Sequence, residues 1–147
     1  GWKLLHFLDV FSLPTVLGLA IGRIGCFLSG CCYGTVCTLP WAVQFPPSHA
    51  SHPSWVHPTQ LYETVCLLLF LAILIPLSRQ SLRPGILSAW VLMGLGLIRF
   101  ILEYTRGDAL HLILGLSVSQ LISMVGIGLS SLMVWKIGRT QNHIPHA

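Results

Sequence analysis

Four long apolar segments dominate the sequence and leave few ways for the chain to fold. They cover residues 13–28, 61–77, 86–104 and 118–137, and the first of them could begin as early as Leu4. A membrane-spanning helix needs about 20 apolar residues, and only helices or closed barrels satisfy their backbone groups inside a bilayer. The segments lack the alternation of barrel strands. The sequence therefore predicts an all-α fold, a polytopic membrane bundle of about four transmembrane helices.

The composition supports the bilayer as the solvent for these helices. Hydrophobic residues make up 54% of the chain and charged residues 8%, whereas soluble domains carry about 25% charged residues. The formal net charge is +4, but the basic residues form no stripe, which argues against nucleic acid as a partner. We expect one transmembrane domain over residues 1–147. Because the chain begins with Gly1 instead of Met, we expect it to be part of a longer protein.

The basic residues predict an orientation in the membrane. Positive charge in short loops marks the cytoplasmic side. Five basic residues flank the apolar segments at places that four spans would bring to one face: Lys3, Arg79, Arg83, Lys136 and Arg139. The C-terminus is therefore expected in the cytoplasm, and segments 29–60 and 106–117 on the outer face. Arg106 is the exception to this rule, and Asp108 could offset its charge.

Segment 29–60 is expected to be a long irregular outer loop. It contains five prolines and no charged residue, and clustered prolines disfavour regular structure. The run 41–45 alternates weakly and could form a short strand. In the helices, Gly94, Gly96, Gly126 and Gly128 are interpreted as packing positions, because small residues let membrane helices approach closely.

Arg99 and Glu103 form the most informative charged pair. They lie four residues apart on the third predicted helix, a spacing that places both on one helix face. A charge at the bilayer centre costs about 2.5–3.5 kcal/mol on insertion scales, so such residues usually face a protein interior or a wet cavity. The pair could be purely structural, or it could belong to a functional site.

Arg23 lies near the outer end of the first predicted helix, between Gly22 and Gly25. A guanidinium group offers a rigid fork of donors that suits phosphate, and the glycines leave space beside it for a ligand or another backbone. The alternative is that Arg23 only extends to the membrane interface. Together with Arg99 and Arg106, it could cradle an anionic head group, with Glu103 orienting one of the arginines.

The block His57-Pro-Thr-Gln-Leu-Tyr-Glu63 opens the second predicted helix. Thr59 is expected to be its N-cap, with Glu63 in the first turn, where a negative charge is favourable. The functional alternative is that His57, Gln60, Tyr62 and Glu63 gather on the outer face. His57 could then act as a base near neutral pH.

Four cysteines surround the start of the outer loop, and their spacing is C-x4-C-C-x4-C: Cys26, Cys31, Cys32 and Cys37. This is not the C-x2-C spacing of zinc sites, and we expect neither a metal nor a cofactor. A disulfide could hold the loop in an oxidising compartment. The alternatives are that the cysteines serve as small packing residues, or that they take part in redox or metal chemistry.

Read together, these motifs resemble the C-terminal part of prolipoprotein diacylglyceryl transferase. The resemblance rests on four blocks in this order: Gly22–Gly25 with Gly30 and Gly34, His57–Glu63, Arg99–Arg106, and Leu116–Gln120. It covers nearly the whole chain. The second and third blocks are the specific ones.

The resemblance implies a seven-span enzyme of the bacterial inner membrane with its active site toward the outer face. Such enzymes move the diacylglyceryl group of phosphatidylglycerol onto the lipobox cysteine of a prolipoprotein signal peptide and release glycerol phosphate. By this similarity, Arg23, Arg99 and Glu103 are expected catalytic residues, and His57 joins them as the candidate base from the polar group at the start of the second helix. The expected substrate-binding residues are Gly22, Gly25, Cys26, Gly34, Gln60, Tyr62, Glu63 and Arg106.

The chain also departs from the family pattern. Cys26 stands where the family usually has asparagine, Ser29 where a second asparagine is common, and Cys31 where it has glutamate. The family's N-terminal spans, which carry a histidine-glycine motif, have no counterpart in the sequence. Two other functions therefore stay open. One is a membrane thiol redox or metal-binding protein built on the cysteines, and the other is a non-catalytic lipid-binding relative.

Overall fold

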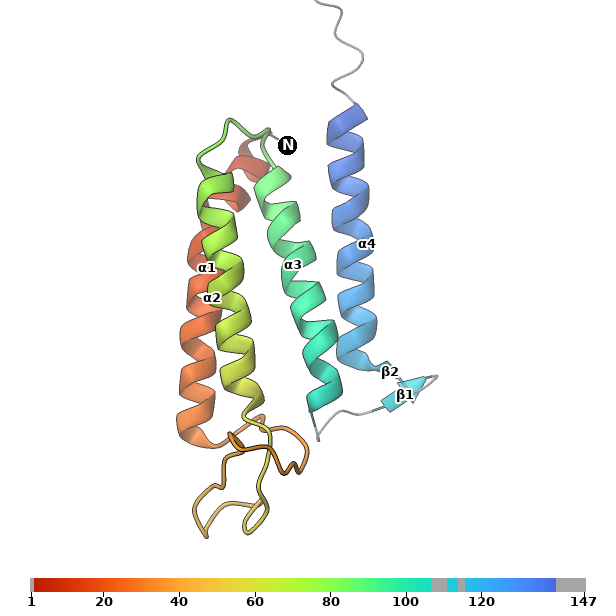
Figure 1. The fold of residues 1–147 in the computed structure, drawn as a ribbon. Coiled ribbons are helices and arrows are strands. Elements are labelled where there is room, and N and C mark those ends of the chain that lie inside the picture. The colour runs from red at the N-terminus through yellow and green to blue at the C-terminus, as the bar shows by residue number, and fades with distance from the viewer. Residues whose placement is uncertain (1, 107–110, 114–115, 140–147) are drawn as a thin grey trace, which may run out of the picture.

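The computed structural model is a bundle of four helices (Figure 1). It describes residues 2–106, 111–113 and 116–139. The helices are α1 (Trp2–Ser29), α2 (Thr59–Ser78), α3 (Ile86–Leu102) and α4 (Val118–Arg139). A 3-10 turn, η1 (Glu103–Thr105), follows α3, and the short strands β1 (His111–Ile113) and β2 (Leu116–Ser117) pair antiparallel before α4. All four helices are long and apolar enough to cross a membrane, which confirms the predicted fold class.

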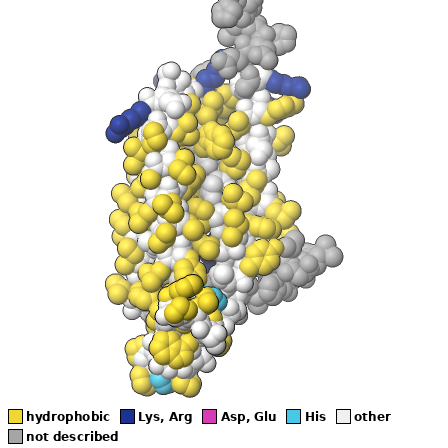
Figure 2. Space-filling model, viewed as in Figure 1, with side chains coloured by type: hydrophobic (Ala, Val, Ile, Leu, Met, Phe, Trp, Pro, Cys, Tyr) yellow, Lys and Arg dark blue, Asp and Glu magenta, His cyan; other side chains and the backbone are white. Residues whose placement is uncertain are grey.

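The outward faces of the helices are strongly apolar. Leu69 and Ile73 on α2 and Val125 on α4 are 62%, 66% and 62% exposed. Hydrophobic side chains cover most of the face shown in Figure 2, and basic side chains gather at the end where α1 begins and α4 ends. An exposed apolar surface of this extent suits lipid tails better than water.

The core lies where α1, α2 and α3 meet. Each helix contributes two of its buried apolar residues: Val16 and Ala20, Leu67 and Leu74, Leu87 and Val91. The hydroxyl of Thr64 on α2 donates to its own helix at Gln60 O (2.9 Å) and approaches Ala20 O at 3.5 Å. The fourth helix packs against α3.

Close helix packing explains three of the four glycines that were interpreted as packing positions. A Cβ on Gly94 would collide with the ring of Phe70 on α2. One on Gly96 would lie 3.0 Å from Ile127 and 3.2 Å from the Ser123 carbonyl on α4. Gly126 meets Leu92 at ordinary contact distance. The expectation was wrong for Gly128, because a Cβ at that position would have nothing within 4 Å of it.

Helix α1 begins at Trp2 and continues through Pro14, so it extends well before the apolar segment that starts at residue 13. Its early polar residue Asp9 has a specific role. The two carboxylate oxygens accept hydrogen bonds from the backbone N–H groups of Gly85 (2.6 Å) and Ser88 (2.8 Å). Asp9 thus caps the start of α3 from another helix, where free N–H groups and the helix dipole favour an anion.

The loop between α1 and α2, which the sequence predicts to be an outer loop, contains isolated bridges instead of the expected strand at residues 41–45. Val43 exchanges two backbone hydrogen bonds with Val56, each 3.0 Å long. The pairing stops there, because Ala42 N turns back to Leu39 O and the Gln44 side chain binds Pro53 O. One bridge is too little to make a strand.

The same loop is fastened to the end of α3. Gly34 forms an isolated bridge with Arg106, and Thr35 N donates to Thr105 O at 3.0 Å. The approach is close, since a Cβ on Gly34 would lie 2.5 Å from Thr105 O and 2.6 Å from the Cβ of His57. The loop therefore joins the end of α1, the start of α2 and the end of α3.

We expect Gly94→Ala to destabilise the bundle, because the added methyl group must displace the Phe70 ring or separate α2 from α3. Overpacking of this kind costs about 1–3 kcal/mol. Thermal unfolding in detergent should show a lower midpoint for Gly94→Ala, whereas Gly128→Ala, with open space around it, should show no loss. Equal midpoints for the two variants would contradict the packing described here.

We expect Asp9→Ala to lower the same midpoint, because two backbone N–H groups at the start of α3 lose their acceptor. The loss of a cap typically costs about 1 kcal/mol. Thr15→Ala is the control, since the Thr15 hydroxyl is exposed and binds only its own helix at Phe11 O. Unchanged stability of the Asp9 variant would show that this cap contributes nothing.

Candidate functional site

One network of four charged side chains joins α1, α2, α3 and the η1 turn that follows α3. Glu63 of α2 lies at its centre. Arg23 Nε of α1 is 3.0 Å from Glu63 Oε1, and Arg99 Nη1 of α3 is 3.6 Å from Glu63 Oε2. Arg99 Nε also lies 3.7 Å from Glu103 Oε2, which is the pair expected from their spacing. Arginines from two separate helices therefore converge on one carboxylate.

The start of α4 fixes the other end of this network. Ser117 Oγ donates to Glu103 Oε1 at 2.7 Å, and Arg99 Nε donates to Ser119 Oγ at 2.9 Å. Ser117 is itself held by a capping box: its Oγ accepts from Gln120 N (3.1 Å), and Gln120 Oε1 accepts from Ser117 N (2.9 Å). The Leu116–Gln120 block was recognised in the sequence only as part of the resemblance. Its Ser-x-x-Gln spacing is the signal that could have predicted this cap.

The network is electrically balanced but not saturated with hydrogen bonds. Two guanidinium groups face two carboxylates, and the exposed fractions of the side chains are 22% for Arg23, 29% for Arg99, 13% for Glu63 and 5% for Glu103. Arg99 Nη1 and Glu103 Oε2 are buried and make no hydrogen bond to any described residue. A buried donor on Arg99 is therefore available to a bound anion.

The position of Glu63 differs from the sequence interpretation. Helix α2 begins at Thr59 and has no acidic residue in its first turn, so Glu63 lies one turn too far along to serve the free N–H groups. Its carboxylate is engaged by Arg23 and Arg99 instead. No spacing along the chain indicates this pairing, because it joins three different helices.

A cavity of about 270 Å³ adjoins the network. Arg23, Glu63 and Arg99 form its charged part, and side chains of α1, α3 and α4 such as Leu19, Leu95 and Ile122 form the apolar remainder. The combination of an apolar lining with a few convergent polar groups is typical of small-ligand sites. It suits a molecule that has an anionic head and an apolar tail.

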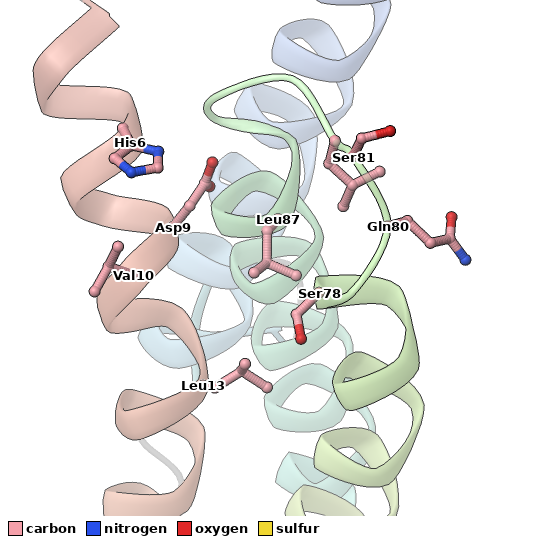
Figure 3. A pocket seen from close by; sticks show the side chains of 9 residues that line it. His6, Asp9, Val10, Leu13, Ser78, Gln80, Ser81 and Leu87 are labelled. Atoms are coloured by element: carbon pink, nitrogen blue, oxygen red, sulfur yellow. The ribbon is translucent and has the colours of Figure 1, made fainter.

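A second pocket of about 370 Å³ lies at the opposite end of the bundle, beside the α2–α3 connection (Figure 3). His6 and Asp9 project from α1 toward the α2–α3 connection, whose Gln80 and Ser81 also line the pocket. The Asp9 carboxylate is already used by two backbone N–H groups of α3. This pocket holds no convergent charges and is not taken as the candidate site.

His57 and Tyr62 form a separate polar group at the loop–α2 junction. His57 Nδ1 lies 3.2 Å from the Tyr62 hydroxyl, which also accepts a hydrogen bond from Trp41 Nε1 at 2.8 Å. In the part of the chain that the structure describes, no hydrogen bond or ion pair joins His57 to the four charged side chains. The structure thus brings His57 and Tyr62 together, but it does not connect them to the charged network.

Thr59 is not the N-cap of α2. Pro58 occupies that position, and no side chain caps the helix. Thr59 Oγ1 instead donates to Cys32 O at 2.7 Å, and Gln60 Nε2 donates to Cys31 O at 2.6 Å. Both side chains thereby attach the outer loop to α2, because the loop offers carbonyl groups that need donors.

The remaining predicted site residues lie in different surroundings. A Cβ on Gly22 or Gly25 would meet nothing within 4 Å, so the flanks of Arg23 are open as expected. Gly34 is enclosed by backbone and loop side chains. Arg106 pairs with Gly34 through its backbone, and its membership of a positive patch stays a prediction. The expectation for Asp108 lies outside the described residues.

All five cysteines are free thiols, so the structure contains no disulfide that holds the loop. Cys26 is half-buried in the last turn of α1, and Cys31 is exposed just after it. Among residues 2–106, 111–113 and 116–139, no group of three or more histidine, cysteine or acidic side chains is arranged to hold a metal ion.

Comparison with known proteins identifies the family of the chain. The family model of prolipoprotein diacylglyceryl transferase matches residues 1–136. A phosphatidylglycerol–prolipoprotein diacylglyceryl transferase of Clostridium tetani is 36% identical over 95% of this chain and 56% of the relative. The protein of the same description from Gloeobacter violaceus is 33% identical over 95% of the chain and 54% of the relative. The protein of the same description from Idiomarina loihiensis is 38% identical over 78% of the chain and 44% of the relative.

The chain thus spans about half the length of the curated relatives it matches. The match nevertheless includes the whole charged network, from Arg23 on α1 to Ser119 on α4. With four helices able to cross a membrane, the chain belongs to the prolipoprotein diacylglyceryl transferase family of multi-pass membrane proteins.

Proposed function

We propose that the protein transfers the diacylglyceryl group of phosphatidylglycerol to the lipobox cysteine thiol of a prolipoprotein and releases glycerol phosphate. One observation carries the proposal: guanidinium groups from two helices meet on a single carboxylate beside a largely apolar cavity. The relatives that carry this activity in their description support it. A phospholipid combines an anionic phosphate with apolar acyl chains, and these chains match the apolar part of the cavity.

In this proposal Glu63 occupies the place of the substrate phosphate. A carboxylate and a phosphate both present two oxygens to guanidinium donors. An incoming head group would replace Glu63 between Arg23 and Arg99 and would take over Arg99 Nη1, which faces Glu63 at 3.6 Å without a hydrogen bond. The two arginines would then face the oxygens on which negative charge accumulates as glycerol phosphate leaves. Donors placed in advance at such oxygens lower the barrier by several kcal/mol in other enzymes, about 3–4 for one donor.

The reaction needs a nucleophile and a base as well as an anion site. The acceptor protein's cysteine sulfur forms a bond to the glyceryl carbon, and the bond from that carbon to the phosphate oxygen breaks with its electron pair on oxygen. The thiol proton must move to a base. His57 is our candidate, since its imidazole lies in a polar group with Tyr62 at the same end of the bundle.

Glu103 is proposed to position Arg99 rather than to move a proton. Its Oε2 faces Arg99 Nε, and its Oε1 accepts from Ser117, which the capping box of α4 fixes in place. A carboxylate that Ser117 holds at one oxygen, with the other oxygen facing Arg99, is suited to orient a guanidinium group. The roles of Gly22 and Gly25 are to leave the flanks of Arg23 open to the lipid.

We also propose the bacterial inner membrane as the location, with the C-terminus in the cytoplasm and the charged network toward the outer face. The support is the separation of charges along the bundle. The basic residues that flank the helices, such as Lys3 and Arg139, lie at one end, where α1 begins and α4 ends, and the network lies near the other. Cytoplasmic loops carry the excess of lysine and arginine.

We expect Arg99→Ala to reduce release of glycerol phosphate by about 100-fold or more, as for loss of one oxyanion donor. Arg99→Lys should retain part of the activity, because it keeps the charge but not the fork of donors. The assay uses membranes in which the protein is produced from its own gene, with phosphatidylglycerol and a lipobox peptide. Leu129→Ala, at an exposed apolar position of α4, is the control and should leave the rate unchanged.

Two outcomes would contradict the transferase proposal in different ways. Unmodified protein that binds phosphatidylglycerol but releases no glycerol phosphate would identify a lipid-binding relative. An Arg99→Ala variant that retains full turnover would show that this arginine is architectural.

We expect Glu63→Gln to separate stability from anion binding. Loss of the central carboxylate leaves two guanidinium groups without their shared counter-charge, which should destabilise the bundle by about 1–3 kcal/mol. Breaking a fully buried ion pair costs more, but these side chains are partly exposed. The same variant should gain more thermal stability from added phosphatidylglycerol than the unmodified protein does, because the phosphate no longer competes with Glu63. Phosphatidylcholine, whose head group has no net charge, should give a smaller gain in thermal stability.

Glu103→Gln is the matched control for this experiment. It also removes one negative charge, but Glu103 contacts only one of the two arginines. It should lower stability without enlarging the gain from phosphatidylglycerol. An equal gain in the two variants would argue against Glu63 as the group that the phosphate replaces.

A further inference from the structure

The end of α1 brings two cysteines together by backbone geometry. Gly30 N donates to Phe27 O and Cys31 N donates to Cys26 O, both at 3.1 Å, and Gly30 has φ = 74°. These two bonds and the left-handed glycine define a Schellman motif. In this motif the residue after the glycine folds back over the last helical turn, usually as an apolar contact. Here the two residues that meet are Cys31 and Cys26.

The side chains make the contact that the backbone predicts. Cys31 Sγ lies 3.6 Å from Cys26 O, so the Cys31 side chain folds back over the turn that carries Cys26. Cys26 is half-buried, whereas Cys31 is exposed. One thiol is thus accessible from outside, with a second thiol held behind it.

The exposed thiol is also the better nucleophile in its surroundings. Ser29 Oγ lies 3.4 Å from Cys31 Sγ and can donate to it, and this hydrogen bond lowers the pKa of Cys31 below the usual value of a thiol. The thiolate is the reactive form, and accessibility combined with a lowered pKa marks reactive cysteines.

We propose that Cys26 and Cys31 form a reversible thiol–disulfide site at the end of α1. The oxidant is an external disulfide. The Cys31 thiolate attacks one of its sulfurs, the external S–S bond breaks, and one sulfur leaves as a thiolate. The Cys26 thiol then loses its proton, and its sulfur attacks Cys31 Sγ in the mixed disulfide and displaces the second external sulfur. Two cysteine thiols become one disulfide, and the external disulfide becomes two thiols.

The other cysteines are less suitable partners for Cys31. Cys32 directly follows Cys31, and the Cα atoms of sequence neighbours are about 3.8 Å apart, below the usual range of about 4.4–6.8 Å for a disulfide. Cys66 lies on α2 in an apolar pocket with Phe70 and Trp90. Cys37 lies further along the loop, where its backbone N–H donates to Trp55 O.

Oxidation would stiffen the junction between α1 and α2. The carbonyl groups of Cys31 and Cys32 accept the side-chain hydrogen bonds of Gln60 and Thr59, which attach the loop to α2. A bond between Cys26 and Cys31 would fix those carbonyl groups relative to the helix that carries Arg23. This site does not depend on the proposed transferase activity.

Peptide mapping of the whole chain in membranes tests the proposal directly. The membranes are treated with oxidised glutathione or with a reducing agent, free thiols are blocked, and the chain is cut with chymotrypsin. Cleavage after Phe27 separates Cys26 from Cys31, so the two peptides stay together only through a disulfide. We expect the joined peptides after oxidised glutathione and their separation after reduction. The Cys32→Ser variant should retain the joined peptides, and Cys31→Ser should lose them.

The proposal is overturned if the unmodified chain yields no joined peptides, or if Cys31→Ser retains them while Cys32→Ser does not. A second measurement examines the reactivity of Cys31. Its alkylation rate at neutral pH should fall several-fold in Ser29→Ala, because loss of the hydroxyl raises the pKa and reduces the thiolate fraction, and the rate should recover at higher pH. Cys66 is the internal control, with an unchanged rate. A Cys31 rate that does not respond to Ser29→Ala also counts against the site.

Discussion

The Glu63 carboxylate, held between Arg23 and Arg99, is the interaction on which the arrangement of the bundle depends. In lipid, apolar side chains gain little by leaving acyl chains for one another, so they do not fix how helices are rotated or how deep they lie. An unpaired charge in that environment is costly. Pairing of α1, α2 and α3 through three charged residues therefore fixes their depth and rotation in a way that apolar contacts alone do not.

The outer loop and α4 complete the arrangement by supplying partners that the charged residues lack. Glu103 would be a buried carboxylate with only Arg99 beside it, but Ser117 donates to it from the capped start of α4. Across the bundle, Thr59 and Gln60 donate to loop carbonyl groups that would otherwise have no donor. The irregular segments thus satisfy backbone groups and also hold the helices at the level of the network.

Sequence reasoning succeeded where the cause is local and failed where it is not. Length and apolarity predicted the four helices, and the spacing of Arg99 and Glu103 predicted their pairing. The partners of Glu63 and Asp9 come from other helices, and no spacing along the chain reveals such contacts. The sequence therefore leaves Glu63 between a helix dipole and a polar group on the outer face, and it indicates no role for Asp9. Thr59 was taken as a cap by residue type, although the loop carbonyl group of Cys32 competes for its hydroxyl. Gly128 was interpreted by type as well, and its surroundings are open.

The balanced network also bears on how an anion would reach it. Without a ligand, two arginines and two glutamates leave no net charge to be held among apolar side chains, which reduces the cost of keeping the site there. A phosphate that binds both arginines brings its own charge, so Glu63 must either turn toward water or take up a proton. Both routes need water nearby. The network lies toward the ends of α1 and α3, and in the proposed orientation these ends face the membrane interface, which would supply this water. The same network in the middle of the helices would hold the arginines equally well, but it would leave the displaced carboxylate without a partner.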